Sequence, residues 1–470
     1  MPDVKRKILW SVLVTGTALA SLSATPAQAD EPSPPPASAP APAPTPAPVP
    51  AAAPSVPASA DPSAALMARG EYIATAGDCV ACHTTPGGRP FAGGLRITTP
   101  MGDVVSTNIT PDPDHGIGKY TEEDFEKAVR HGVRRDGSRL YPAMPYVSYS
   151  GMTDDDVKAM YAWFMHGVKP VAVTPPVTEL NFPANLRITM AVWNLVAGSV
   201  TPETGDSATY DKMRRGKYLA NALEHCGTCH TPRNMMLSEK EDSFLAGAPL
   251  LGWYAPNITS SKTSGIGNWS EDNLVTYLKT GHVAGLSQAA GPMGEAVEHS
   301  TSHLTDDDLH ALAAYILQVP AKEDEAEHGP REGFGQALDA PDMRSGELTR
   351  IDKLDEMTGP HIYDANCAAC HGGNGAGTSD HYAPSLFHNS VVGSAHPDDL
   401  IMTVLNGVDR TAGGLHAYMP GFDHDSDVQR LSNTEIAALV NYVTATFGSG
   451  DHGVTADQVE KMRKQLPKTP

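Results

Sequence analysis

The fold of this chain is decided by three short stretches of one pattern: Cys79-Val80-Ala81-Cys82-His83, Cys226-Gly227-Thr228-Cys229-His230 and Cys367-Ala368-Ala369-Cys370-His371. In a C-x-x-C-H run, two thiols form thioether bonds to a porphyrin and the imidazole of the next residue binds the iron. Two intervening residues let one turn of chain hold both sulfurs along one edge of the macrocycle, with the His beneath the iron. The three runs predict three covalently bound haem c groups.

A Cys pair alone is also typical of a redox dithiol, a zinc site or a disulfide. A redox dithiol does not need an adjacent His in all three places, and a zinc site requires its Cys pairs to converge. All six Cys of the chain lie in these motifs, so none is left for a separate structural disulfide. We therefore assign all six thiols to haem attachment.

A haem that only passes electrons needs a second axial ligand, and Met is the usual soft choice. One Met follows each motif, 61, 63 and 48 residues after its His: Met144 in Tyr141-Pro142-Ala143-Met144-Pro145, Met293 in Gly291-Pro292-Met293-Gly294, and Met419 in Ala417-Tyr418-Met419-Pro420. Met is ordinarily core filler, so the parallel placement carries the argument. We predict the iron ligand pairs His83/Met144, His230/Met293 and His371/Met419. The competing Met candidates are Met101, Met235 and Met236, and the His residues expected at the surface or against propionates are His115, His131, His282 and His303.

Six-coordinate irons have no open position for small-molecule chemistry. The sequence also shows no Rossmann glycine pattern, phosphate loop or Ser-His-Asp constellation. We therefore predict no catalytic residue toward an organic substrate, and a chain that conducts electrons.

The amino terminus has the pattern of a secretory signal peptide, predicted as residues 1–29. Basic residues 5–7 precede an apolar run over 8–20, and Ala27-Gln28-Ala29 forms a small-residue cleavage site. The alternative is an uncleaved anchor, although Thr15-Gly16-Thr17 interrupts a stretch that is short for spanning a bilayer. Export agrees with haem c, which is attached outside the cytoplasm in bacteria.

The chain of 470 residues is strongly acidic, with a formal net charge of −21. Removal of residues 1–29 leaves 31 basic and 54 acidic side chains, a net charge of −23. This balance excludes nucleic acid as a partner.

Composition and internal repeats predict the domain organisation. Residues 30–63 are almost wholly Pro, Ala and Ser, which favours an extended linker. The stretch Arg69-Gly70-Glu71-Tyr72-Ile73-Ala74 matches Arg215-Gly216-Lys217-Tyr218-Leu219-Ala220, and Asn108-Ile109-Thr110 matches Asn257-Ile258-Thr259. The third copy is more diverged. We predict haem domains at 64–180, 205–322 and 345–450, an apolar interdomain segment at 181–204, an exposed linker at 323–344 and a tail at 451–470.

Each copy is predicted to close with a helix. Thr153, Thr305 and Ser432 are expected N-caps, and Asp156, Asp308 and Glu435 complete capping-box spacing three residues later. An aromatic residue follows ten positions after each cap: Trp163, Tyr315 and Tyr442. This arrangement resembles the class I cytochrome c fold, in which the final helix crosses the first near such Gly and aromatic residues. The predicted fold class is mainly α, with three tandem class I cytochrome c domains.

The interdomain segment is unusually apolar over Phe182–Val200. It contains Arg187 and Asn194 and is too short to span a membrane. Two interpretations stay open at this point: packing between domains, and a surface patch for a membrane or a partner subunit.

From Ala64 to about Gly450 the chain resembles the triheme cytochrome c subunits of membrane-bound, quinone-linked dehydrogenases of acetic acid bacteria and relatives. The most specific pieces are Ser106-Thr107-Asn108-Ile109-Thr110-Pro111-Asp112, Tyr141-Pro142-Ala143-Met144-Pro145-Tyr146, Phe164-Met165-His166-Gly167-Val168-Lys169-Pro170 and Trp269-Ser270-Glu271-Asp272. The resemblance implies a subunit that takes electrons from a catalytic dehydrogenase subunit oxidising an alcohol, a sugar or a sugar acid. It also implies transfer to ubiquinone, and peripheral attachment to the periplasmic face of the inner membrane.

The family serves flavoprotein and pyrroloquinoline-quinone (PQQ) dehydrogenases, and the run 291–300 looks slightly more like the flavoprotein-linked type. Two other functions are alternatives to an electron-transfer subunit. A self-sufficient multihaem enzyme such as a peroxidase requires a five-coordinate iron. A terminal-oxidase cytochrome c subunit normally brings a transmembrane anchor.

Overall fold

The structure is a computed structural model that describes residues 62–99, 101–196, 198–339, 358–423 and 428–466. The chain divides into two units, Met1–Ala58 and Ser59–Pro470, and every described residue lies in the second. The predicted signal peptide, nearly all of the predicted Pro/Ala linker and the start of the third predicted domain lie outside the described residues. Below, segments 1, 2 and 3 denote residues 64–180, 205–322 and 345–450.

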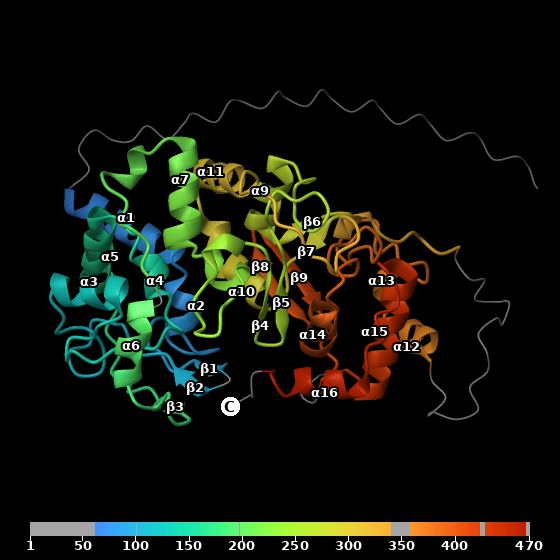
Figure 1. The fold of residues 1–470 in the computed structure, drawn as a ribbon, viewed down its shortest axis with the longest axis horizontal. Helices are drawn as coiled ribbons and strands as arrows, with labels where there is room; N and C mark the ends of the chain where they lie inside the picture. Colours follow the sequence, from blue (N-terminus) through green and yellow to red (C-terminus); the bar gives the residue numbers. More distant parts are fainter. Residues whose placement is uncertain (1–61, 100, 197, 340–357, 424–427, 467–470) are drawn as a thin grey trace, which may run out of the picture. The chain divides into compact units, whose positions relative to one another are not determined.

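Helices predominate, and the strands form small antiparallel groups (Figure 1). Segment 1 contains α1 (Pro62–Ala76, which begins just before it), α2 (Cys79–His83), β1 (Arg96–Thr99), β2 (Gly102–Val105), α3 (Glu122–His131), α4 (Tyr146–Tyr149), α5 (Asp154–His166) and β3 (Glu179–Leu180). Between segments 1 and 2 lies α6 (Ile188–Val196).

Segment 2 contains α7 (Lys212–Tyr218), η2 (Leu219–Leu223), α8 (Gly227–His230), β4 (Ala248–Leu250), β5 (Trp253–Ala255), α9 (Glu271–Thr280), β6 (His282–Val283), β7 (Ser287–Gln288), α10 (Gly291–His299) and α11 (Asp306–Ile316). Segment 3 contains α12 (Gly359–Asn366), α13 (Ala368–His371), α14 (Asp398–Asn406), β8 (Val408–Ala412), β9 (Leu415–Met419) and α15 (Asn433–Phe447). The tail forms α16 (Ala456–Arg463), which buries Val459 and Met462. Four short 3-10 helices lie in the connections of the described residues, and one of them, η4 (Thr301–His303), precedes α11; η2 is a short π-helix.

The first and last helices of each segment cross at a glycine, as the sequence predicts. The crossing pairs are α1 with α5, α7 with α11, and α12 with α15. A Cβ on Gly70 would lie 2.1 Å from the carbonyl oxygen of Ala159, and one on Gly216 would lie 2.0 Å from that of Ala311. In segment 3 a Cβ on Gly359 would lie 2.5 Å from the carbonyl oxygen of Ala438. The aromatic residues beside these three glycines are Trp163, Tyr315 and Tyr442. Only glycine lets the two backbones approach so closely, which explains the repeated Arg-Gly pair.

The closing helices begin at the predicted caps, but only the third has a capping box. Thr153, Thr305 and Ser432 each accept a hydrogen bond from the backbone three residues on. The Glu435 carboxylate in turn accepts a hydrogen bond from the backbone amide of Ser432. The Asp156 and Asp308 carboxylates do not accept from the amides of their caps, and the predicted capping boxes of segments 1 and 2 are therefore wrong.

The carboxylates of Asp156 and Asp308 instead join segments 1 and 2 in a reciprocal manner. Asp156 accepts hydrogen bonds from Arg69 of its own segment (2.8 Å) and from the Tyr218 hydroxyl of the next (2.6 Å). Asp308 accepts from Arg215 of its own segment (2.7 Å) and from the Tyr72 hydroxyl of the preceding one (2.5 Å). Each Tyr hydroxyl also accepts a hydrogen bond from the backbone amide of an N-cap residue, Tyr218 from Thr153 and Tyr72 from Thr305, both at 3.2 Å. The two near-copies thus exchange identical bonds.

The hydrophobic cores also group segments 1 and 2 together and leave segment 3 apart. One continuous core contains buried residues of segments 1 and 2, including Ile73, Tyr149, Tyr218 and Leu309. A second core is built from segment 3 and α16. The sequence predicts an exposed linker at 323–344, but the described part of this linker is buried in places. Arg331 is 4% exposed and donates to the backbone of Ser264 and Asn257. The linker therefore helps to hold segment 2.

Candidate haem centres

Each C-x-x-C-H motif forms one short helical turn. These turns are α2, α8 and α13, of which α2 and α13 are labelled in Figure 1. In segments 2 and 3 the amide of the motif His donates to the carbonyl of the first motif Cys, at 3.0 Å in His230 and 2.9 Å in His371. A helical turn thus brings both thiols and the His together, as haem attachment requires.

A backbone carbonyl fixes each motif imidazole through Nδ1. His83 Nδ1 lies 2.6 Å from the Thr107 oxygen, His230 Nδ1 lies 2.7 Å from that of Pro256, and His371 Nδ1 lies 2.9 Å from that of Pro384. With Nδ1 donating, Nε2 carries the lone pair that can bind a metal. Burial lowers the pKa of His83 and His371, and lowers that of His230 to about 4. The imidazoles are therefore neutral, which is the form that ligates iron.

The six thiols are free in the structure, and no disulfide joins them. Burial raises the pKa of Cys79 and of Cys367 to about 12, so both are neutral thiols at physiological pH. In the described part of the chain, no group of three or more His, Cys, Asp or Glu side chains comes together as a metal site. The Cys pairs do not converge on one point, which argues against the zinc interpretation.

The three Met candidates are half-buried and pack against the two main cores. The competing candidates are exposed: Met101 is 41% exposed, Met236 is 49% and Met235 is 100%. Met144 and Met293 also occupy equivalent positions. The residue four before each Met, Leu140 or Ala289, donates its amide to the glycine that ends the preceding helix, Gly132 or Gly281, at 2.8 Å in both cases. The iron-ligand roles of the three Met residues stay a prediction.

Segment 2 has a buried donor that fits a haem carboxylate. The indole N–H of Trp269 is buried and has no hydrogen-bond partner among the described residues. A donor left unpaired inside a protein costs roughly 1–3 kcal/mol, so a bound acceptor is expected there. A haem propionate is such an acceptor, and the residues present therefore fit haem c.

Comparison with known proteins gives consistent matches. The family model described as cytochrome c matches residues 357–446. The chain is 44% identical over 426 residues to the fructose dehydrogenase cytochrome subunit of Gluconobacter japonicus, covering 88% of this chain and 86% of that protein. It is 40% identical to the cytochrome c subunit of the quinone alcohol dehydrogenase of Gluconobacter oxydans (86% and 83% covered) and 40% identical to the gluconate 2-dehydrogenase cytochrome c subunit of Pantoea cypripedii (87% and 92% covered).

The chain belongs to the family of dehydrogenase cytochrome c subunits. It is accordingly an electron-transfer cytochrome subunit with covalently bound haem c. The resemblance inferred from the sequence is confirmed.

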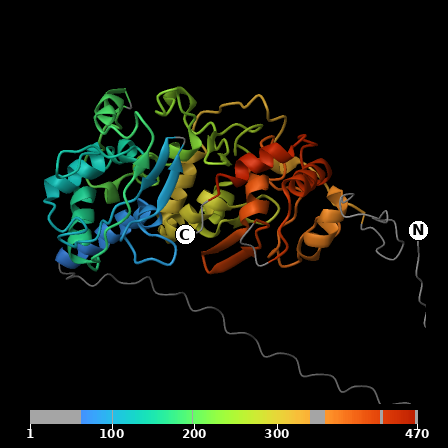
Figure 2. The same ribbon diagram turned by 90° about the horizontal axis from the view of Figure 1, so that it is seen from below.

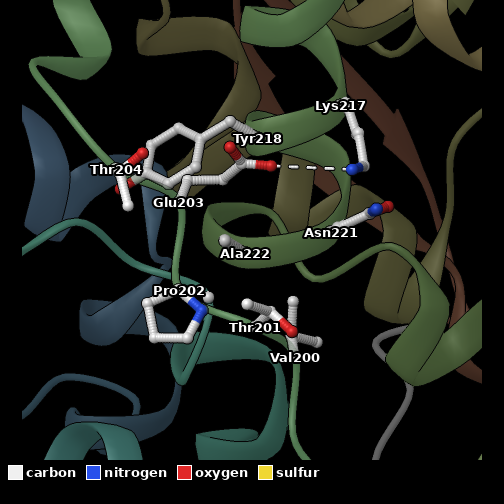
Figure 3. Close-up of a pocket in the computed structure, with 10 residues that line it drawn as sticks. Val200, Thr201, Pro202, Glu203, Thr204, Lys217, Tyr218, Asn221 and Ala222 are labelled. Atoms are coloured by element: carbon white, nitrogen blue, oxygen red, sulfur yellow. Dashed lines mark ion pairs between the residues drawn. The ribbon is translucent and has the colours of Figure 1, made fainter.

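The cytochrome subunit has a cavity of about 390 Å³ where residues 200–204 run past Tyr218 (Figure 3). Glu203 forms ion pairs with Lys217 (3.5 Å) and Arg214 (3.0 Å) at its edge. No motif Cys or His and no candidate Met lines it. The cavity belongs to the seam between segments 1 and 2, not to a haem site.

Sequence reasoning missed several groups that orient the motif imidazoles or connect the segments of the cytochrome subunit. The carbonyls that orient the three His come from backbone, which any residue can supply, so no side-chain signal marks them. The Tyr–Asp exchange had a signal, because Tyr72 and Tyr218 occupy matching places in the repeat. The arginines Arg331 and Arg410 lie outside the repeated motifs and had none.

Proposed function

We propose that the cytochrome subunit carries three haem c groups, one in each segment, with the axial pairs His83/Met144, His230/Met293 and His371/Met419. Haem c supplies one-electron redox chemistry when bound. The chain attaches each group through two Cys, orients the imidazole through Nδ1 and covers the opposite side with a half-buried Met. The single observation that carries the proposal is the threefold Nδ1–carbonyl arrangement.

We infer that the relay takes electrons from a catalytic dehydrogenase subunit and passes them to ubiquinone. The relatives are cytochrome subunits of fructose, alcohol and gluconate dehydrogenases, which supports a dehydrogenase partner. The sequence of residues 291–300 favours a flavoprotein over a PQQ enzyme. Absorption and mass analysis of the partner that copurifies from membranes will identify its cofactor.

Membranes from a strain lacking this chain test the electron path. The proposal predicts that sugar- or alcohol-dependent reduction of a ubiquinone analogue is lost, while the dehydrogenase still reduces a soluble artificial acceptor. Unchanged reduction of the ubiquinone analogue would refute it.

We further propose peripheral attachment to the periplasmic face of the inner membrane. No helix among the described residues is long and apolar enough to span a bilayer. The apolar strip consists of large side chains that are 46–100% exposed: Val177, Phe182, Leu186, Ile188, Val192, Leu195, Met235 and Met236. The Trp193 indole donates to the Met236 carbonyl at 2.7 Å, which holds the 235–236 loop against α6.

A basic side chain lies beside the apolar strip, although the chain as a whole is acidic. Arg187 stands between Leu186 and Ile188 in the sequence, donates to the Arg139 carbonyl at 2.6 Å and lies over the Tyr141 ring. An exposed apolar strip with an arginine beside it suits a surface of anionic lipid.

Flotation with phosphatidylglycerol-containing vesicles tests this surface. Ile188→Glu combined with Leu195→Glu should abolish binding of the haem-loaded subunit. Leu415→Glu, at an apolar residue outside the strip that is 52% exposed, should leave binding unchanged. Equal loss in both variants would refute the role of the strip.

A further inference from the structure

The β8–β9 hairpin of segment 3 extends to α10 of segment 2 (Figures 1 and 2). The hairpin ends at Met419, and its first strand carries Arg410. Ala412 of the same strand packs with Ala289 and Val297 beside Met293. One short hairpin therefore joins the candidate iron ligand of segment 3 to the surroundings of the candidate iron ligand of segment 2.

Among the described residues, Arg410 is a buried cation that forms no ion pair with a carboxylate. The residue is 3% exposed. Its guanidinium donates to the carbonyl of Ala289, four residues before Met293, and its Nε has no hydrogen-bond partner in the described structure. Glu298 is the acidic side chain that faces it, without forming an ion pair, and Tyr277 and His282 are its other titratable neighbours. A buried charge without a counter-charge is costly.

Segment 1 provides an internal comparison for the place that Arg410 occupies. A Cβ on Gly281, which ends α9, would lie 2.5 Å from the guanidinium carbon of Arg410. A Cβ on Gly132, which ends α3, would lie 2.7 Å from the ring of Tyr146. The two glycines are equivalent, because both precede a candidate Met by 12 residues and accept the same backbone bond.

The same space is thus filled by a neutral phenol in segment 1 and by a cation in segment 2. Tyr146 is 3% exposed and donates to Asn194 at 2.7 Å. The hydroxyl that donates this bond carries its proton, so the phenol is neutral. The two haem sites, otherwise near-copies, differ here by one full positive charge.

We propose that Arg410, supplied by segment 3, raises the reduction potential of the haem in segment 2 above that of the haem in segment 1. A haem gains an electron on reduction, and a nearby fixed cation stabilises the reduced state. Net charge and burial are among the factors that set haem potentials. At an effective dielectric constant of about 20, a fixed unit charge changes the reduced-to-oxidised ratio about tenfold or more at separations up to roughly 10 Å. The inference rests on the proposed haem site at His230 and Met293.

Potentiometric titration of the purified, fully haem-loaded subunit tests this role. Arg410→Gln should lower one of three one-electron potentials by about 59 mV, which is a tenfold change in the ratio for a one-electron couple. Arg410→Lys keeps the charge and should leave all three potentials close to those of the native subunit. Met293→His identifies the component that belongs to segment 2.

A second variant covers the case in which Arg410→Gln does not fold with its haems. Glu298→Gln removes the facing negative charge and should raise the same potential. If Met293→His shifts one potential but the Arg410 and Glu298 variants do not, the charge effect is refuted and the haem site stands. If Met293→His shifts none, the proposed haem site itself fails.

Discussion

The reciprocal Tyr–Asp bonds predict that weakening one segment loosens the other. Tyr218 is 1% exposed, and its hydroxyl donates to Asp156 at 2.6 Å and accepts the Thr153 amide at 3.2 Å. Tyr218→Phe removes a hydrogen bond to a charged group, worth about 1.5–3 kcal/mol, and leaves a buried amide unpaired, at about 1–3 kcal/mol. Because Asp156 keeps Arg69 and Ser207, we take about 3 kcal/mol in total. This corresponds to about a 100-fold rise in the opening equilibrium.

Hydrogen exchange followed by mass spectrometry on the haem-loaded subunit measures that opening. Amides of α5 in segment 1 and of α7 in segment 2 should both exchange about 100-fold faster, because the lost bonds connect the two helices. Tyr72→Phe, the reciprocal change, should act similarly on α11 and α1. Tyr315→Phe is the matched control, because its hydroxyl has only a 3.5 Å contact with Asn221, and it should change exchange less than tenfold. Faster exchange confined to α7 in Tyr218→Phe would refute a coupled pair.

Three further outcomes are expected. The reduced native subunit should bind no carbon monoxide, and Met144→Ala should bind one equivalent per chain by visible spectroscopy; carbon monoxide binding to the native subunit would contradict the assigned ligand. Burial raises the pKa of Asp399 to about 7. Between about pH 4 and pH 7 the folded state therefore keeps a proton on this carboxyl that the unfolded state has released. The free energy of unfolding consequently falls as pH rises from about 4 to 7. In urea denaturation Asp399→Asn should therefore be on the order of 2 kcal/mol more stable than the native subunit at pH 8 and equal to it at pH 4, whereas the same difference at both pH values would refute the assignment. Ser432→Ala removes the hydroxyl that accepts the Glu435 amide in the one complete capping box among the closing helices, and should destabilise segment 3 by about 1 kcal/mol in the same assay, against no change if the cap is unimportant.

Local motifs let the sequence predict the helix crossings and caps. Gly70, Gly216 and the aromatic residues ten positions after each cap lie where the repeat placed them, because close helix packing admits no side chain at the crossing. The sequence allows two interpretations of residues 182–200, interdomain packing and an exposed apolar patch, and the structure shows a part of each. Met190 and Trp193 pack against the protein, whereas Ile188 and Leu195 face outward.

What the sequence could not predict depends on contacts between distant residues. Asp156 has capping-box spacing, but Arg69 and Tyr218 are stronger partners for its buried carboxylate than the cap backbone is. Arg410 lies 117 residues after Met293, in a strand with no unusual pattern. Its role depends on how segment 3 packs on segment 2, which no local periodicity encodes.

The central claim is that this one chain holds three haems, one at each motif. Intact-mass analysis combined with a pyridine haemochrome assay on the purified subunit tests it most directly, with paired Cys→Ala changes in each motif in turn. The account predicts three haems per native chain and two in each of the three variants, with the thioether-linked mass lost from the altered segment alone. A native chain with one or two haems, or a variant that retains three, would contradict it.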